Sequence, residues 1–153
     1  MLYKYGMNEV DPNNWQRLLS AEPQITKGIS KGLATYFESA PYDSLTLIES
    51  AYFTAQADAN VLDRWPVMQV IDDKGTDIMT IAGEGYLTAN QLKTYVFCRQ
   101  CQNSPSTNTL VNIRLPDFVV KGEWNVLFAL ANNGALDHWT VAWITYRQIL
   151  LNR

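Results

Sequence analysis

Hydrophobic and polar residues alternate with a period of two along most of the chain, from about Gln24 onward. Short runs rich in Val, Ile, Thr, Tyr, Phe and Trp lie between clusters of Gly, Pro, Asn and Asp, which is the pattern of β-strands joined by turns. The strongest runs are Leu45–Phe53, Trp65–Ile71, Asp77–Ile81, Leu92–Cys98, Thr109–Leu115, Trp124–Leu130 and His138–Ile149, and weaker runs lie at Ile25–Phe37 and Phe118–Val120. Because no helices separate these short strands, no segment is available for parallel crossovers. We therefore expect an all-β fold, an antiparallel two-sheet sandwich or jelly roll.

Two of the intervening clusters have the composition of hairpin turns. The segment Asp72–Gly75 places a glycine where a positive φ angle is expected, and the segment Asn132–Gly134 offers a second loop of this kind. Hairpins join antiparallel neighbours. Both clusters therefore favour an antiparallel arrangement.

The first 24 residues follow a different pattern. The pair Asp11–Pro12 is typical of a helix N-cap and first turn, and Trp15, Leu18 and Leu19 follow at helical spacing. We expect a short amphipathic helix that ends near Pro23. Two placements are open: an N-terminal arm formed by residues 1–24, ahead of a β-sandwich domain formed by residues 25–153, or a helix folded back on the sandwich as a lid.

The last predicted strand is apolar on both faces. Trp139, Val141 and Trp143 share one face, and Ala142, Ile144 and Tyr146 share the other. Such a strand is buried on both sides, so one face meets the core and the other meets the arm or another subunit. We therefore expect a homo-oligomer, a dimer or trimer, with Trp139, Trp143 and Tyr146 as candidates for the subunit interface.

Composition and charge narrow the classes of function. A chain of 153 residues with 47% hydrophobic and 12% aromatic content is expected to fold as one globular unit. The net charge is −3 and no basic block occurs, so we expect no nucleic-acid partner. The longest apolar run, Val126–Ala131, is far shorter than the roughly 18 residues of a membrane span. The first ten residues do not follow the signal-peptide pattern, so we expect synthesis and use in a cytoplasm.

The two cysteines, Cys98 and Cys101, form the most conspicuous short motif. Two thiolates at this spacing suit a redox pair or half of a zinc site. However, the pair follows a predicted strand and not a helix N-terminus, and His138 is the only histidine available as a further zinc ligand. The sequence favours two free thiols, with an intersubunit metal site or a reversible disulfide as alternatives.

No catalytic set stands out. His138 follows Asp137, but adjacent residues of a strand point to opposite faces, so the carboxylate is poorly placed to orient the imidazole. No Gly-x-Ser-x-Gly motif supplies a nucleophile. We expect no enzymatic activity, no catalytic residue and no cofactor.

Acidic residues gather at one predicted turn. Asp72, Asp73, Asp77 and Glu84 offer oxygen atoms of the kind that calcium prefers, but their spacing does not follow the twelve-residue calcium loop. Aspartates beside a Lys-Gly turn commonly stabilise the turn itself. The sequence favours this structural role over a metal site.

The aromatic content allows a carbohydrate-binding module as an alternative. The chain has five tryptophans, eight tyrosines and five phenylalanines, and exposed rings on a β-sandwich stack on sugars. Most of these rings follow the strand alternation, which favours packing in the core or at a subunit interface.

Three segments resemble a known group of proteins. Arg64–Gly75, Leu115–Gly122 and Asp137–Tyr146 are similar to strands and turns of the small β-sandwich structural proteins of tailed-bacteriophage virions, and most of all to the jelly-roll decoration, or cement, proteins of the phage capsid. The resemblance covers roughly residues 40–150. It implies a non-catalytic protein that binds the outside of the assembled capsid as a dimer or trimer, with the major capsid protein as its partner.

On this basis we expect a virion protein on the capsid exterior that is made in the host cytoplasm. Trp15, Leu18 and Leu19 are candidates for the capsid contact, because the apolar face of the predicted helix has no assigned partner. The alternatives are a phage tail or baseplate protein, or a β-sandwich module that recognises a host glycan.

Overall fold

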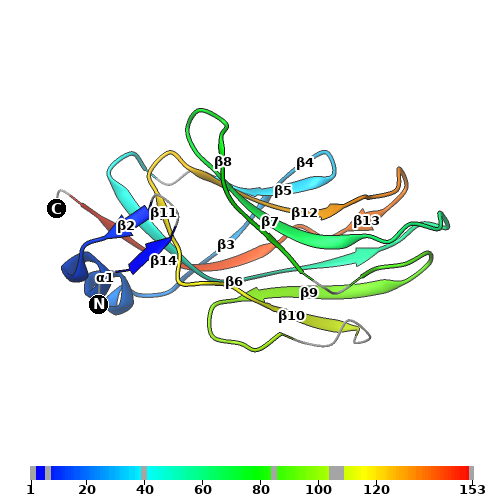
Figure 1. The fold of residues 1–153 in the computed structure, drawn as a ribbon, viewed down its shortest axis with the longest axis horizontal. Helices are drawn as coiled ribbons and strands as arrows, with labels where there is room; N and C mark the ends of the chain where they lie inside the picture. The colour runs from blue at the N-terminus through cyan, green and yellow to red at the C-terminus, as the bar shows by residue number, and fades with distance from the viewer. Residues whose placement is uncertain (1–2, 6–7, 39–40, 84–85, 104–108, 152–153) are drawn as a thin grey trace.

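The chain folds as two stacked β-sheets with one short helix (Figure 1). The computed structural model describes residues 3–5, 8–38, 41–83, 86–103 and 109–151. The seven-stranded sheet has the order β10 (Leu110–Arg114), β9 (Leu92–Cys98), β6 (Ser44–Gln56), β14 (Trp143–Leu150) and β3 (Gln24–Lys27), and β11 (Val119–Lys121) and β13 (His138–Trp139) also pair with β6. The five-stranded sheet has the order β4 (Ile29–Lys31), β5 (Ala34–Phe37), β12 (Asn125–Ala131), β7 (Trp65–Ile71) and β8 (Asp77–Ala82). A separate antiparallel pair joins β1 (Tyr3–Tyr5) to β2 (Asn8–Val10).

The main core lies between the two sheets, as the strand alternation predicts. In β7 and β12 every second residue is buried, and these residues face the seven-stranded sheet. The rings of Phe97 in β9 and Phe128 in β12 lie 5.5 Å apart between centroids and join the two layers. Burial of each such ring contributes about 1.5–3 kcal/mol. The predicted all-β two-sheet sandwich is confirmed.

The two predicted hairpin turns differ in outcome. The segment Asp72–Gly75 does connect β7 to β8: Asp72 Oδ1 accepts hydrogen bonds from the backbone N–H groups of Lys74 (2.9 Å) and Thr76 (2.8 Å), and Gly75 has φ +82°. The segment Asn132–Gly134 is not a hairpin, because it carries the chain from β12 in one sheet to β13 in the other. Turn composition alone does not specify which sheet the next strand joins.

One strand pair departs from the expected antiparallel pattern. β9 and β10 run parallel, with Leu110 beside Thr94 and Arg114 beside Cys98. Residues 99–109 connect them, and eleven residues span up to about 36 Å, twice the roughly 17 Å of a five-residue strand. A helix is therefore not required for this parallel crossover, contrary to the sequence argument.

The last predicted strand is interrupted, and the interruption separates its aromatic residues. Trp139 pairs with Ala55 and Trp143 pairs with Tyr52, so four steps on this strand match three steps on β6. The extra residue is a bulge, which moves the side chains that follow it to the other face. Trp139 therefore packs on the core side, whereas Trp143 lies on the outer side of the sheet. The expectation that both tryptophans share one face is wrong.

The helix α1 (Pro12–Ser20) forms where the sequence predicts it. Asp11 caps it by accepting a hydrogen bond from the backbone N–H of Asn13 (2.8 Å), and Pro12 is its first residue. Trp15 and Leu18 are buried against the seven-stranded sheet. The helix therefore takes the second of the two placements that the sequence allows, a lid folded back on the sandwich (Figure 1).

Candidate functional site

The outer face of the seven-stranded sheet is divided by a bulge in β6. Thr145 pairs with Ser50 and Tyr146 pairs with Ile48, so Glu49 is an extra residue on β6. Before the bulge the odd-numbered side chains Leu45 and Leu47 face outward, and after it the even-numbered ones do. The outer face thus has two halves that differ in what covers them.

We call the first part the covered half. It consists of Leu45, Leu47, Val119 and Ile149, which lie beneath α1. Each of these side chains is at most 9% exposed, and together with Trp15 and Leu18 they form a second apolar cluster separate from the main core. This half is closed by the chain's own helix.

We call the second part the open half. The register places the following outward-facing residues there: Ile25 and Lys27 of β3; Trp143 and Thr145 of β14; Ser50, Tyr52, Thr54 and Gln56 of β6; Leu92, Thr94, Val96 and Cys98 of β9; Leu110, Asn112 and Arg114 of β10. Five large apolar side chains are exposed: Ile25 71%, Leu92 56%, Leu110 53%, Tyr52 45% and Trp143 42%. These exposed apolar side chains make the open half the candidate interaction surface.

Two aromatic rings occupy the centre of the open half. Trp143 and Tyr52 are directly paired on neighbouring strands, and the same row continues to Val96 on β9. At its other end, Lys27 pairs with Trp143 and places Nζ 5.9 Å from the centroid of the indole ring. The row therefore runs from a cation through two aromatic rings to an aliphatic side chain.

Hydroxyl groups flank this row. Thr54 and Thr94 lie opposite each other on β6 and β9, with their Oγ1 atoms 2.8 Å apart. Thr140 Oγ1 accepts a hydrogen bond from the backbone N–H of Thr54 (3.0 Å). The open half thus combines apolar rings with short polar side chains, a composition typical of binding surfaces.

Charged residues mark the boundary between the two halves. Glu49 accepts hydrogen bonds from Arg99 Nε (3.0 Å) and Arg147 Nε (2.7 Å), and Arg99 NH1 also donates to Asp117 (2.9 Å). We call Glu49, Arg99, Arg147 and Asp117 the boundary network. Burial raises the pKa of Glu49, but the hydrogen bonds and positive charges of the two arginines outweigh burial and hold the pKa below its usual value of 4.5. Arg147 also donates to the carbonyl oxygens of Leu19 and Ala21, so the network reaches the C-terminal end of α1.

The two cysteines lie beside this network. Cys98 ends β9, and it is joined to Cys101 by a disulfide with a Cα–Cα separation of 5.6 Å. The expectation of two free thiols is therefore wrong. The chain turns immediately after the strand and brings the two residues together, and this turn encloses Arg99. Spacing alone gave no sign of that turn.

The predicted capsid-contact residues lie elsewhere than expected. Trp15 is 4% exposed and Leu18 is 0% exposed, because both pack on the covered half, and Leu19 packs against the same cluster. Their apolar face therefore has a partner within the chain. In this fold they are not available as a surface contact, which corrects the prediction made from the helix alone.

The predicted subunit-interface residues are separated by the sheet. Trp139 and Tyr146 pack against the main core, and Tyr146 lies 5.1 Å from Phe37 between ring centroids while its hydroxyl donates to Gln24 Oε1 (2.9 Å). Of the three, only Trp143 lies on the outer face. Tyr52, its exposed neighbour, was missed, although its position between the outward polar residues of β6 is a signal that strand alternation offers.

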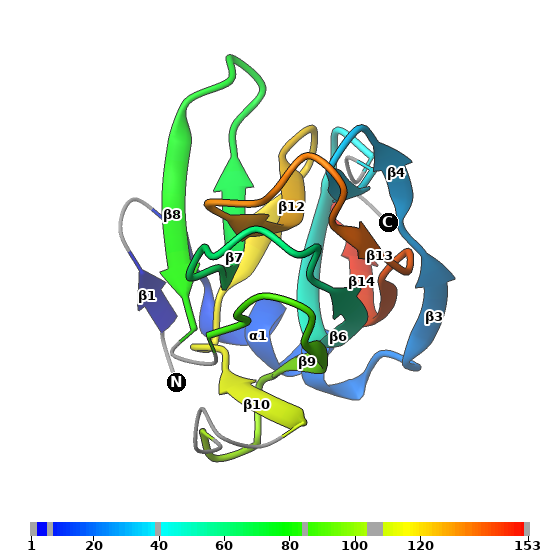
Figure 2. The ribbon, with the colours of Figure 1, turned by 90° about the vertical axis from the view of Figure 1, so that its right-hand side faces the viewer.

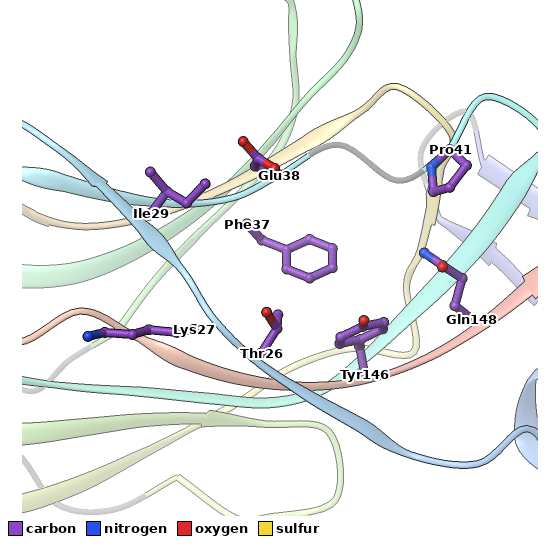
Figure 3. Close-up of a pocket in the computed structure, with 8 residues that line it drawn as sticks. All are labelled: Thr26, Lys27, Ile29, Phe37, Glu38, Pro41, Tyr146 and Gln148. Atoms are coloured by element: carbon purple, nitrogen blue, oxygen red, sulfur yellow. The ribbon is translucent and has the colours of Figure 1, made fainter.

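Tyr146 also lines a small pocket at the edge of the sandwich (Figure 3). The pocket has a volume of about 260 Å³, with Phe37 pointing into it and with Lys27 and Glu38 among its lining residues. This volume lies slightly below the roughly 300–1,000 Å³ of typical ligand sites. We regard the pocket as secondary to the open half.

A buried ion-pair cluster accounts for Asp137. Its carboxylate accepts hydrogen bonds from Arg64 Nε (2.8 Å) and from the backbone N–H groups of Asp58 (2.8 Å) and Gly134 (2.7 Å). Burial raises the pKa of Asp137, but these hydrogen bonds and the Arg64 charge outweigh it and hold the pKa below the usual value. His138 is exposed. Asp137 therefore joins the loops at one end of the sandwich, a role that sequence reasoning missed because Arg64 and Asp137 are far apart along the chain.

Asp72 and Asp77, at the two ends of the β7–β8 turn, have structural partners. Asp72 caps the turn, and Asp77 Oδ2 accepts hydrogen bonds from Thr80 Oγ1 (2.6 Å) and Gln69 Nε2 (3.3 Å). Glu84 lies outside the described residues. Within the described ranges, no group of three or more His, Cys, Asp or Glu side chains is arranged to hold a metal ion.

Among these same residues, no helix has the length and apolar character of a membrane span.

Comparisons with known proteins give structural neighbours alone. No protein family and no curated protein matches the chain. Among solved structures, the chain is similar to a mutant VP2 protein of infectious bursal disease virus in derived T=1 particles, with 14% identity over 86% of this chain and 30% of that one and a TM-score of 0.35. The T13 particle of that virus gives 11% identity over 86% and 32% with a TM-score of 0.38, and its Gx strain gives 14% over 88% and 31% with 0.37. The chain spans about a third of the length of these proteins, and similarity at this level assigns no function.

Proposed function

We propose that the chain is a non-enzymatic structural protein of a phage virion, a decoration protein that attaches to the outside of the assembled capsid. The observation that carries this proposal is the open half, where Trp143, Tyr52, Ile25, Leu92 and Leu110 are exposed on a sandwich whose other outer half is closed by its own helix. The resemblance of three chain segments to phage decoration proteins supplies the class of partner, the major capsid protein.

The polar clusters support a binding role over a catalytic one. The carboxylates of Glu49 and Asp137 are held by arginines, and Asp72 is held by backbone N–H groups of a turn. Each of these hydrogen-bonded groups stabilises a junction between strands or loops. The surface that remains exposed although it is apolar is the open half. A decoration protein requires attachment by apolar and aromatic surface of this kind.

A lattice strengthens a modest surface of this kind. When many copies bind one particle, or when the protein is a dimer or trimer, each contact lengthens the time for which the other contacts stay bound. The expected homo-oligomer is compatible with this arrangement and remains part of the proposal.

A second candidate function follows from the pairing of Trp143 with Tyr52. Two neighbouring rings flanked by the hydroxyls of Thr54 and Thr94 also suit the stacking and hydrogen bonding of a sugar. A tail or baseplate protein that recognises a host glycan would use the same surface. A glycan array separates the two functions, because a decoration protein should give no hits.

The proposal is tested by co-sedimentation with empty capsids assembled from the major capsid protein encoded with this chain. We expect the wild-type protein to sediment with capsids to saturation and to raise the temperature at which the capsids dissociate. Trp143→Ser is expected to weaken attachment at least tenfold, since a central aromatic side chain at an interface is worth about 2 kcal/mol or more. The matched control is Val61→Ser, because Val61 is 92% exposed in the connection between β6 and β7 and is not one of the outward-facing residues of the open half. Absence of wild-type binding at high protein concentration contradicts the proposed function.

A further inference from the structure

On the β3 side, the open half offers its face and not its edge to a partner. At one side of the sandwich, β3 and β4 form the edges of the two sheets (Figure 2). Each carries a lysine: Lys27 lies over the Trp143 ring, and Lys31 Nζ lies 5.2 Å from the centroid of the Tyr36 ring. Lysines on edge strands disfavour the pairing of a further strand. Docking by strand addition at this side is therefore disfavoured, and the exposed rings of the face are the available surface.

The charge on this face has one sign. The chain as a whole has a net charge of −3. Among the outward-facing residues of the open half, Lys27 on β3 and Arg114 on β10 are basic, and none is acidic. The two cations lie on opposite margins of the face, with uncharged side chains between them. The carboxylates of Glu49 and Asp117 are engaged by Arg99 in the boundary network, and Glu38, which lines the small pocket with Lys27, follows β5 in the other sheet.

This pattern disfavours a second copy of the chain as the occupant. Two open halves placed face to face bring four cations into one interface, with no carboxylate on either face to pair with them. Like charges opposed across an interface cost several kcal/mol. An interface between identical copies is self-complementary, and this face is not.

The dimensions suit one modest contact. Five strands spaced about 4.8 Å apart give a width of roughly 20 Å, and three to four outward rows give a similar length, so the footprint is about 400 Å². A standard interface buries about 800 Å² on each partner. A single contact of this size is weak, which fits a protein held by many equivalent positions on one particle.

We propose that the open half binds through its face to a protein surface that carries an apolar strip bordered by carboxylates. On the capsid, this strip is the binding site. The inference rests on the proposed function, since the capsid supplies the partner. Trp143 and Tyr52 contact the strip, and Lys27 and Arg114 pair with the carboxylates on its two sides. The rings supply most of the affinity, and the cations set the orientation.

The experiment measures binding to the same capsids as a function of charge and salt. We expect Lys27→Glu and Arg114→Glu to weaken binding each by about threefold to fivefold and the double variant by at least tenfold. Wild-type affinity is expected to fall as NaCl rises from 50 to 300 mM, and the double variant is expected to lose this salt dependence. Lys74→Glu is the matched control, because it makes the same change on the exposed β7–β8 turn. Lys27→Arg and Arg114→Lys are expected to retain binding, and thermal melting confirms that each variant is folded.

The outcomes separate the inference from the proposed function. Capsid binding by wild type that is unaffected by the charge and aromatic substitutions overturns the inference and leaves the decoration role in place. Absence of capsid binding by wild type overturns the proposed function itself. If light scattering finds a concentration-dependent dimer that Trp143→Ser abolishes, a second copy of the chain occupies the open half. This outcome overturns the inference that the partner is an acidic protein surface. Salt-independent binding to capsids overturns the role of the two cations.

Discussion

The covered and open halves of one sheet face share the strands β6 and β14 but are built from different side chains. In the covered half, Leu45, Leu47, Val119 and Ile149 are at most 9% exposed beneath α1. In the open half, Trp143 and Tyr52 are more than 40% exposed and alternate with hydroxyls. Both halves carry aliphatic side chains, and the open half differs in its exposed aromatic rings and short polar side chains, which suit a surface that must also tolerate water. This difference supports the proposal that the open half binds a partner.

The boundary between the halves is set by one residue. The bulge at Glu49 changes which side chains of β6 face outward, and it places a carboxylate where Arg99 and Arg147 meet. If β6 ran through Glu49 as a regular strand without the bulge, Ala51 and Phe53 would face outward in place of Tyr52. Because of the bulge, the single strand β6 supplies side chains both to the main core and to the open half.

The largest expected difference is between two tryptophan-to-alanine substitutions, one at a side chain packed on the covered half and one in the open half. Trp15→Ala removes a side chain that is 4% exposed and should lower the free energy of unfolding by about 3–5 kcal/mol. Trp143→Ala removes one that is 42% exposed and should lower it by less than about 1 kcal/mol. Urea denaturation followed by circular dichroism measures both. Equal losses in the two variants contradict the division of the face into two halves.

The disulfide is expected to give the next largest effect, because it fixes the turn that holds Arg99 at the boundary. Loop-closure entropy for a ring closed by residues 98–101 gives about 2 kcal/mol of stabilisation. We expect the double variant Cys98→Ser, Cys101→Ser to lose about 1–2 kcal/mol in urea denaturation. Dithiothreitol should destabilise the wild type by a similar amount and leave the double variant unchanged. A wild type that is insensitive to the reductant argues against a stabilising disulfide.

The boundary network is expected to give a smaller effect that depends on pH. Because the folded-state pKa of Glu49 lies below 4.5, this carboxylate contributes stability above about pH 4.5, and the contribution is lost as the pH falls through the folded-state pKa. We expect Glu49→Gln to lower the free energy of unfolding by about 1 kcal/mol at pH 7, and we expect this difference to shrink as the pH falls below about 4.5. Glu22→Gln, at an exposed position, is the control and should match the wild type throughout. A constant difference between Glu49→Gln and wild type across this range contradicts the pKa assignment.

Local alternation predicted most strands of the two sheets, but it missed β1 and β2, merged β3, β4 and β5 into one run, and did not predict the two faces. The predicted runs Trp65–Ile71 and Leu92–Cys98 have the same bounds as β7 and β9. Uninterrupted alternation of apolar and polar residues indicates a strand with one buried face. The bulges at Glu49 and after Trp139 have no compositional signature, and each reverses the facing of every residue beyond it. The second bulge is why Trp143 was placed with Trp139, whereas the local alternation of Ser50, Tyr52 and Thr54 with apolar residues does indicate that Tyr52 faces outward.

The helix shows a second limit of sequence reasoning. Asp11, Pro12 and the spacing of Trp15 and Leu18 predicted its start and its buried face. An amphipathic face shows that something covers it, but not whether the cover belongs to the same chain. The contact with Leu47 and Val119 joins residues far apart in sequence, so it is visible in the fold and not in the pattern.

The smallest expected effect lies at the β9 and β10 side of the open half. Leu92→Thr and Leu110→Thr replace side chains that are 56% and 53% exposed with a residue that favours strands, so each should change the free energy of unfolding by less than about 0.5 kcal/mol. Leu45→Thr in the covered half, where the side chain is 7% exposed, is the matched control and should cost several times more. Urea denaturation at two protein concentrations is the measurement. A loss above about 1 kcal/mol in Leu92→Thr that grows with protein concentration shows that another copy covers this surface in solution, because stability that depends on association rises with concentration. A small, concentration-independent change leaves the open half free for a different partner.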